Sequence, residues 1–290
     1  MHANFDITPG FLNNEAEFKD PFFSQFELRP MPKPLELSEG VQKQYKFPTF
    51  YTNVTCSMGV FFCDFKKAKS ILPDPDMTPL SMLKGRALVL LGCYQYRSVY
   101  NIKPYNEIAM TIPVFMGKGM NLPVVPMVVP KFKNFGYYVF GMPVTSKENQ
   151  IRGNKIWGLP KVTHTIDITQ KDGVEETIAR EPDGTPYFTL KVPMVGTPTR
   201  VRQSANIFSK LDGNLLKSPT CFEGQFKIQK FMKRLFEPKM APGETFPNSC
   251  LTIGNTPSAK ILASLDIDPR PFQFRYSDRV SSIFDLPTQF

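Results

Sequence analysis

The chain has almost no histidine and little cysteine. Of its 290 residues only His2 and His164 are histidine, and the five cysteines form no CxxC pair. The chain therefore has almost no ligands for a Cys/His zinc site, and we expect no metal. Unpaired cysteines in apolar surroundings, such as Cys93, are typical of small core residues in a reducing compartment. A Ser-His-Asp triad lacks support, because His164 is the only internal histidine and no GxSxG elbow is present.

Long hydrophobic runs are also missing. The most apolar stretch, residues 122–129, is short and is interrupted by Pro123 and Pro126, so we expect no membrane span. The chain does not open with a basic segment followed by an apolar run, and therefore shows no signal peptide. The glycines of Gly117-Lys-Gly119 lack the rest of a nucleotide-binding motif. These absences predict a cytoplasmic protein without a membrane partner.

Proline and phenylalanine are abundant. The 28 prolines are about twice the usual share of ~5%. Because proline lacks a backbone donor and fixes φ, so many of them exclude long uninterrupted helices. The 26 phenylalanines and a hydrophobic fraction of 41% supply enough apolar material for a sizeable core. This composition favours short strands, edges and structured loops.

The formal net charge of +9 raises the question of a nucleic-acid partner. The lysines and arginines are scattered, however, and their densest clusters, residues 66–69 and 227–234, are short. The second cluster alternates with apolar residues and predicts an amphipathic helix with a solvated basic face. We therefore expect no nucleic acid, and attribute the charge to an attraction for anionic small substrates.

The order of the predicted elements indicates one β-rich domain over residues 45–290. We expect strands at residues 86–99, 107–116, 137–144, 164–169, 175–180 and 187–192. Turn signals at Lys171-Asp-Gly173 and Pro182-Asp-Gly184 connect the later strands as an antiparallel meander. A short helix at residues 64–72 ends before Pro73. Many strands at short spacing with few helices predict a closed barrel or a sandwich.

Residues 1–44 are polar and rich in proline, which predicts an extended N-terminal arm. The arm nevertheless carries six phenylalanines: Phe5, Phe11, Phe18, Phe22, Phe23 and Phe26. Leaving them in water instead of burying them would cost roughly 1.5–3 kcal/mol each. We expect the arm to dock on a neighbouring subunit of a homo-oligomer; the alternative is an arm folded back over its own domain.

The segment Gly153-Asn-Lys-Ile-Trp-Gly-Leu-Pro-Lys161 contains the most informative lysine. Its glycines, tryptophan and proline predict a rigid apolar turn directly before Lys161. Burial disfavours the charged form of a lysine and lowers its pKa, so that a free amine is present at neutral pH. Such an amine attacks a ketone and forms an iminium that accepts electrons from a breaking C–C bond. Taken alone, the segment fits a surface lysine after a Gly-Pro turn better.

Three motifs add a resemblance. The pattern Gly-x-x-x-aromatic-Gly-x-Pro-Lys is similar to the signature around the Schiff-base lysine of the acetoacetate decarboxylase family. The segment from Gly92-Cys-Tyr-Gln-Tyr-Arg to Pro104-Tyr-Asn-Glu107 resembles the family segment that ends in the pocket glutamate. More weakly, Tyr45-Lys-Phe47 and Ile71-Leu-Pro-Asp-Pro75 resemble the N-terminal block. Together these similarities cover roughly residues 41–168.

The resemblance implies a closed antiparallel β-barrel flanked by a few helices, as one catalytic domain and in a homo-oligomer. Lys161 would be the nucleophile, and Glu107 would orient or exchange protons with the iminium and enamine. Trp157, Leu159 and Val162 would contribute to the apolar substrate surroundings. The implied activity is that of a carbon–carbon lyase that removes CO₂ from a β-keto acid. No cofactor is implied, because the lysine itself supplies the electron sink.

Several positions depart from the family pattern. The family's second lysine is replaced by Val162, its Gly-Arg-Glu reads Gly153-Asn154-Lys155, and a second pocket glutamate falls at Gly92. The arginine that would hold the substrate carboxylate has no clear counterpart. The departures favour an alternative, a Schiff-base aldol condensation, retro-aldol cleavage or dehydration of a keto acid. A third possibility is a non-catalytic barrel that binds a hydrophobic small molecule.

Overall fold

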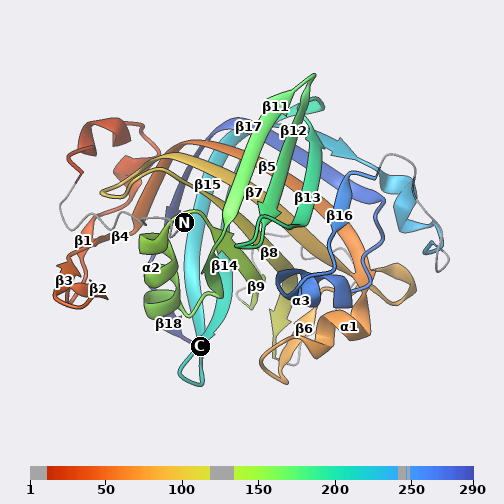
Figure 1. Cartoon of the computed structure of the whole chain (residues 1–290), viewed down its shortest axis with the longest axis horizontal. Coiled ribbons are helices and arrows are strands. Elements are labelled where there is room, and N and C mark those ends of the chain that lie inside the picture. The colour runs from red at the N-terminus through yellow and green to blue at the C-terminus, as the bar shows by residue number, and fades with distance from the viewer. Residues whose placement is uncertain (1–11, 118–133, 241–245, 247–248) are drawn as a thin grey trace.

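The structure, a computed structural model, describes residues 12–117, 134–240, 246 and 249–290. Its centre is a closed barrel of seven strands in the order β9-β14-β15-β17-β5-β7-β8, closed by the pairing of β8 with β9 (Figure 1). The strands are β5 (Thr49–Asp64), β7 (Arg86–Val99), β8 (Tyr105–Met116), β9 (Phe135–Val144), β14 (Thr197–Leu211), β15 (Asn214–Lys230) and β17 (Pro271–Phe284). The closed β-barrel expected from the sequence is confirmed.

The pairing is mixed, which corrects the expectation of a wholly antiparallel barrel. Strand β14 pairs parallel with β9, and so does the short strand β10 (Lys161–Thr163). Parallel neighbours need a crossover connection. Here the crossover from β9 to β14 contains a helix, β10 and a separate hairpin sheet, and the helix and β10 position the segment around Lys161.

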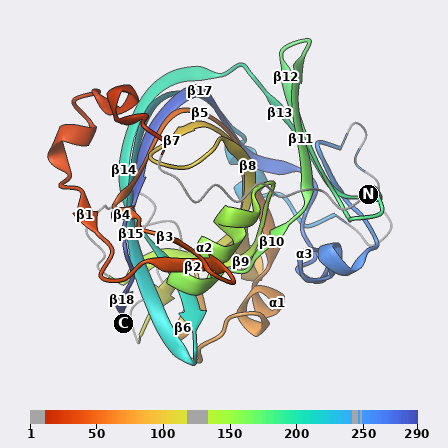
Figure 2. The ribbon, with the colours of Figure 1, turned by 60° about the vertical axis from the view of Figure 1, so that its left-hand side comes forward.

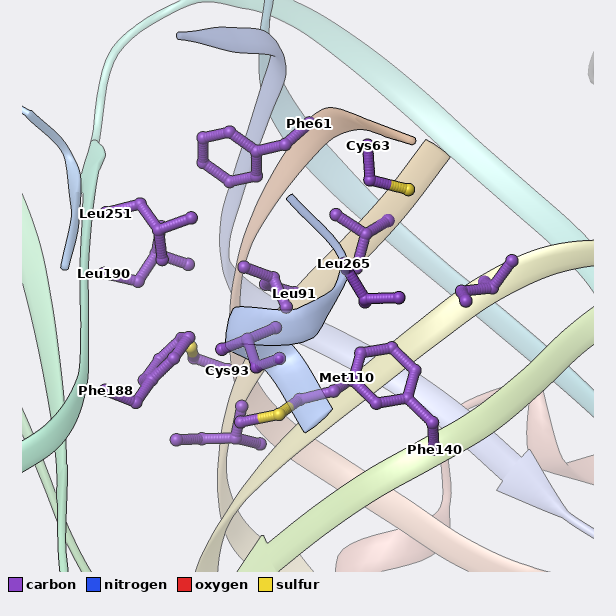
Figure 3. Close-up of a cluster of buried hydrophobic side chains, with 14 of the residues drawn as sticks. Phe61, Cys63, Leu91, Cys93, Met110, Phe140, Phe188, Leu190, Leu251 and Leu265 are labelled. Atoms are coloured by element: carbon purple, nitrogen blue, oxygen red, sulfur yellow. The ribbon is translucent and has the colours of Figure 1, made fainter. Parts of the chain in front are cut away.

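A second sheet covers one side of the barrel. It consists of β11 (Thr165–Lys171), β12 (Val174–Arg180), β13 (Pro186–Pro193) and β16 (Leu251–Ile253), all antiparallel. Alternate residues of the barrel strands point outward to this sheet, so that Leu91 and Cys93 of β7 pack with Phe188 and Leu190 of β13 (Figure 3). Cys93 is fully buried in this core, in agreement with the sequence analysis.

Three α-helices are present in the described residues, and the most important for the site is α2 (Lys147–Trp157). Ser146 caps its N-terminus by accepting a hydrogen bond from the backbone N–H of Asn149, and Gly158 ends it in the left-handed region at φ 60°. The helix lies at one end of the barrel (Figure 2). The sequence analysis predicted only a turn here.

The other helices are short. The predicted helix at residues 64–72 is α1 (Phe65–Ser70), capped by the Asp64 side chain, and α3 (Lys260–Ser264) lies near the C-terminus. None of the helices in the described ranges has the length and apolarity to cross a bilayer. The remaining elements are η1 (Glu15–Phe18), η2 (Phe23–Gln25), η3 (Leu83–Gly85), η5 (Met232–Leu235), η6 (Pro257–Ala259), β1 (Arg29–Pro30), β2 (Leu35–Ser38), β3 (Val41–Lys43), β4 (Lys46–Phe47), β6 (Met77–Pro79) and β18 (Thr288–Gln289).

The amphipathic helix predicted at residues 227–234 is wrong. Strand β15 continues to Lys230 and pairs with β17 on one side, where Lys227 is opposite Tyr276. On its other side it pairs with β14. Only η5 follows it. Pairing on both edges of the strand outweighs the local helical pattern.

The described part of the N-terminal arm folds over its own barrel. Phe18, Phe22 and Phe23 are buried in one cluster with Phe50 of β5 and Tyr100. Burial within the same chain therefore removes these rings from water. Contact with a neighbouring subunit stays untested, and Phe5, Phe11 and the apolar stretch 122–129 lie outside the described residues.

Candidate active site

The barrel encloses a cavity of about 180 Å³. All seven barrel strands contribute to its lining, because inward-facing side chains alternate with outward-facing ones along each strand. Most of the wall is apolar, with Val54, Met58, Ala109, Val139, Phe222 and Val280 among its residues. Lys161 and Glu107 bring a possible nucleophile and a carboxyl group to this wall.

The backbone around Lys161 is fixed from both sides. After α2 ends, the N–H of Leu159 donates to the carbonyl of Gly153 at 3.0 Å. The strand β10 then starts at Lys161 and pairs with Met142 of β9. The side chain of Lys161 points inward and the residue is only 6% exposed. The structure thus places Lys161 in the cavity and not on the surface.

Gly153 lies directly beside the aliphatic chain of Lys161. A Cβ atom at position 153 would lie 2.3 Å from Cδ and 2.7 Å from Cγ of Lys161, much less than a van der Waals contact. Gly158 is needed for a different reason: its φ is positive, and a Cβ atom at this position would lie 2.4 Å from the carbonyl oxygen of Lys210. The two glycines of the motif therefore allow the helix to end beside the lysine that it shields.

Lys161 and Glu107 form a buried ion pair. Nζ of Lys161 lies 2.6 Å from Oε2 of Glu107, and both side chains are 7% exposed. The other carboxylate oxygen accepts a hydrogen bond of 3.2 Å from the hydroxyl of Tyr96. Burial lowers the pKa of Lys161, and although Glu107 opposes this shift, the net direction is downward. A larger fraction of the amine is therefore neutral than in a solvated lysine.

Arg152 of α2 contributes to this electrostatic environment and was missed by the sequence analysis. It is 2% exposed, and its guanidinium lies 4.5 Å from the ring centre of Tyr45 and donates to Oγ1 of Thr49 at 2.9 Å. Its positive charge adds to the lowering of the Lys161 pKa. A serine cap and a terminal glycine were the available signals for the helix that carries it.

The three expected apolar residues have different positions. Leu159 is buried and lines the cavity. Trp157 is buried outside the lining, where its indole N–H donates to the carbonyl of Asp285 at 2.8 Å and its ring stacks on Phe284. Val162 is 42% exposed because alternation along β10 turns it away from Lys161. The expectation that Val162 faces the substrate is therefore corrected, and Trp157 holds the end of α2.

The position of the missing family glutamate is also explained. Gly92 lines the cavity on β7 opposite Ala109 of β8, two residues from the pairing of Tyr94 with Glu107. A Cβ atom at position 92 would lie 2.8 Å from the hydroxyl oxygen of Tyr94. Tyr94 therefore occupies the space that a longer side chain at this position would need. The site has a single carboxyl group beside its lysine, among the residues that the structure describes.

Comparison with known proteins agrees with the barrel fold. The family model "Acetoacetate decarboxylase (ADC)" matches residues 32–215. Among solved structures, the acetoacetate decarboxylase from Legionella pneumophila superposes with a TM-score of 0.55 at 13% identity, covering 84% of this chain and 87% of that chain.

The enduracididine biosynthesis enzyme MppR with HEPES buffer bound superposes with a TM-score of 0.53 at 12% identity, covering 84% and 87% of the two chains. MppR complexed with pyruvate gives 0.50 at 12% identity over 83% and 90%. Comparison with curated proteins gives no match. The family model covers well over half of the chain, and its match includes Lys161, Glu107 and the helix beside them: the chain belongs to the acetoacetate decarboxylase family.

Proposed function

We propose that Lys161 forms a Schiff base with the carbonyl group of a keto acid or ketone. One observation carries the proposal: Nζ of Lys161 is buried at the wall of an apolar cavity, 2.6 Å from the Glu107 carboxylate. Burying a lysine amine costs free energy, because the amine loses the water that solvates it at a surface position. The lowered pKa of a buried nucleophile is a physical reason to keep the lysine in the cavity despite this cost.

The reaction that we propose first is the loss of CO₂ from a β-keto acid. The neutral amine of Lys161 adds to the ketone carbon, and loss of water from the carbinolamine gives a protonated imine. The bond between the α-carbon and the carboxylate then breaks, and its electron pair moves into the iminium. CO₂ leaves, and an enamine remains. Protonation of the enamine carbon and hydrolysis by water release the ketone and restore the amine.

Glu107 is placed to move the protons of this sequence. Its carboxylate can accept a proton from the Lys161 ammonium before attack and can return one to the enamine after CO₂ has left. The hydroxyl of Tyr96 orients it through the 3.2 Å hydrogen bond. The apolar wall favours loss of the charged carboxylate, because the product CO₂ is neutral and needs no solvation.

A second candidate is a Schiff-base condensation or dehydration of a keto acid. It is favoured by the direct contact between Glu107 and the amine, since a carboxylate at this position can also remove a proton from the carbon next to the iminium. The absence of a second lysine after Lys161 is a further reason to consider it. MppR has been obtained with the condensation product of pyruvate and imidazole 4-carboxaldehyde. In both reactions Lys161 has the same role.

Borohydride trapping tests the Schiff base. Incubation with acetone or pyruvate and sodium borohydride should add the mass of the ketone less its carbonyl oxygen atom to Lys161, because imine formation releases water and reduction adds two hydrogen atoms. Peptide mass spectrometry locates the adduct. Lys161→Met should abolish this adduct, whereas Lys155→Met, at an exposed lysine of α2, should leave it unchanged. Modification spread over exposed lysines, with none at Lys161, would indicate a non-catalytic binding barrel.

Release of CO₂ from acetoacetate separates the two reactions. A decarboxylase should evolve CO₂ at a rate that Lys161→Met abolishes and that Glu107→Gln lowers strongly. Trapping of pyruvate without CO₂ release from acetoacetate or longer β-keto acids would favour condensation or dehydration instead.

We further propose that the protein is a homo-oligomer. The described part of the arm covers its own barrel, so a contact between subunits would involve other surfaces or residues 1–11. Light scattering of the full-length chain and of a chain lacking residues 1–11 measures the mass. A full-length protein that is monomeric at micromolar concentration would contradict the proposal.

A further inference from the structure

We propose that Arg275 binds the anionic far end of an elongated substrate whose carbonyl group reacts at Lys161. The inference rests on the proposed Schiff-base function and specifies its substrate class: a ketone or keto acid with an apolar middle and a terminal carboxylate or similar anion. Arg275 lies on β17 and lines the same cavity as Lys161 and Glu107.

Lys161 and Arg275 are the two cationic side chains of the lining. The row of paired residues that contains Arg275 runs through Met58 and Gly92 to Ala109 of β8, and Glu107 is two residues from Ala109 on that strand. Three steps from strand to strand, at about 4.8 Å each, give roughly 14 Å around the wall from Arg275 to β8. A ligand that contacts both groups must therefore extend across the cavity.

Arg275 also lies on a different wall. It is opposite Met58 of β5 in the sheet, and Met58 is opposite Gly92 of β7. Glu107 is on β8, the next strand after β7, so two strands lie between the strand of Arg275 and that of Glu107 in a ring of seven. The guanidinium and the Lys161–Glu107 pair thus belong to well-separated parts of one cavity.

The charge of Arg275 is not neutralised by the protein. Lys161 has Glu107 as its partner, whereas no carboxylate of the described residues forms an ion pair with Arg275. Its Nε donates to Oε1 of the buried Gln273 at 2.8 Å, which fixes the plane of the guanidinium. Within the described part of the chain its two terminal nitrogens have no hydrogen-bond partner. A half-buried guanidinium with a fixed plane and free terminal N–H groups is suited to bind a carboxylate through two parallel hydrogen bonds.

The wall between the two polar groups is apolar and selects the middle of the ligand. Val54, Met58, Ala109, Phe222 and Val280 contribute to it. A hydrocarbon spacer replaces water there at no cost in lost hydrogen bonds, whereas a polar spacer would lose its solvation. The cavity volume of about 180 Å³ corresponds to about ten or more water-sized groups, more than a short keto acid fills. Arg275 therefore offers the carboxylate contact for which the sequence analysis found no counterpart, but at the far end of the ligand.

The test uses methyl ketones that carry a carboxylate at the other end of a methylene spacer of increasing length. The matched neutral probe is the terminal primary amide of the same length. Half-saturation for borohydride trapping at Lys161 is measured by intact mass for the wild type, Arg275→Met, Arg275→Lys and Arg279→Met. Arg279 is an exposed arginine of the same strand outside the cavity lining and serves as the control for loss of one charge.

We expect the wild type to prefer the carboxylate over the amide by about tenfold or more at one spacer length. Arg275→Met should remove this preference while trapping the amide as before, Arg275→Lys should retain part of it, and Arg279→Met should retain all of it. A preference that persists in Arg275→Met, or equal half-saturation of both probes at every length, overturns the inference.

A second measurement separates this inference from the proposed function. A saturated carboxylic acid of the best length cannot form a Schiff base, yet it should raise the melting temperature of the wild type and not that of Arg275→Met. If no ketone is trapped at Lys161 but this stabilisation occurs, the proposed function fails and Arg275 remains an anion site. If ketones are trapped and the saturated acid has no effect that depends on Arg275, only the inference fails.

Discussion

Replacing Gly153 by alanine should inactivate the protein without unfolding it. The added Cβ would lie 2.3 Å from Cδ of Lys161, whereas carbon atoms in contact are about 3.5–4.0 Å apart. The aliphatic chain of the lysine must therefore move by more than ~1 Å. Its Nζ is 2.6 Å from Glu107, and a shift of this size breaks that contact.

The two effects of this substitution on stability partly offset each other. Overpacking of a buried position costs about 1–3 kcal/mol, and the replacement of a glycine inside α2 by alanine returns about 1 kcal/mol of helix propensity. The net loss should be at most about 2 kcal/mol. The trapping rate should fall far more, by on the order of 100-fold, because a nucleophile misplaced by 1 Å loses its alignment with the carbonyl carbon.

The assay compares the rate of borohydride trapping at Lys161 with the free energy of unfolding from chemical denaturation. Lys155→Ala is the control, because it adds alanine to an exposed position of the same helix. It should keep both the rate and the stability near those of the wild type. A Gly153→Ala protein that traps ketones at the wild-type rate would refute the explanation of the motif.

Three further changes test other parts of the structure. Leu159→Gln admits water beside Lys161, so the lowered pKa of Lys161 should rise and the pH profile of trapping should move to higher pH; an unmoved profile excludes burial as the cause. Burial raises the pKa of Glu175, so its contribution to stability is present below its unfolded pKa of ~4.3 and is lost as pH rises through the folded value. Glu175→Gln should therefore have a higher melting temperature than the wild type, by a margin that grows from acidic to neutral pH. A difference in melting temperature that does not change with pH would contradict this. Phe23→Ala should lower the free energy of unfolding by up to about 3–5 kcal/mol, because the residue is 2% exposed and its ring centre lies 4.8 Å from that of Phe50. A loss below about 1 kcal/mol would show that the arm does not stabilise the barrel.

Local features of the sequence were sufficient for one helix and for six strands: β7, β8, β9, β11, β12 and β13. The strand predicted at residues 86–99 is β7, Arg86–Val99, because alternating apolar residues and flanking turns act within a few residues of each other. The short helix expected at residues 64–72, ended by Pro73, is α1 for the same reason. The family resemblance of the segment with Gly153, Gly158 and Lys161 singled out a lysine that the structure buries at the cavity wall.

Other local signals were present but were outweighed or overlooked. The capping serine and terminal glycine of α2 were both visible, yet the glycines and the proline of the segment favoured a turn. At residues 227–234 a basic and apolar alternation fitted a helix, but residues 227–230 belong to strand β15, which pairs with β14 and β17. A residue's neighbours in a sheet come from distant parts of the chain, so the local pattern could not reveal them.

The tertiary structure alone decided which side chains share the cavity. Burial of Lys161 depends on Glu107, Arg152 and the barrel wall, which come from separate elements and meet only when the seven strands close. Val162 follows Lys161 in the sequence but faces outward, whereas Arg275, more than a hundred residues away, lines the same cavity. Sequence spacing fixes the direction of a side chain relative to its own strand, but the registers between strands determine what it faces across the barrel.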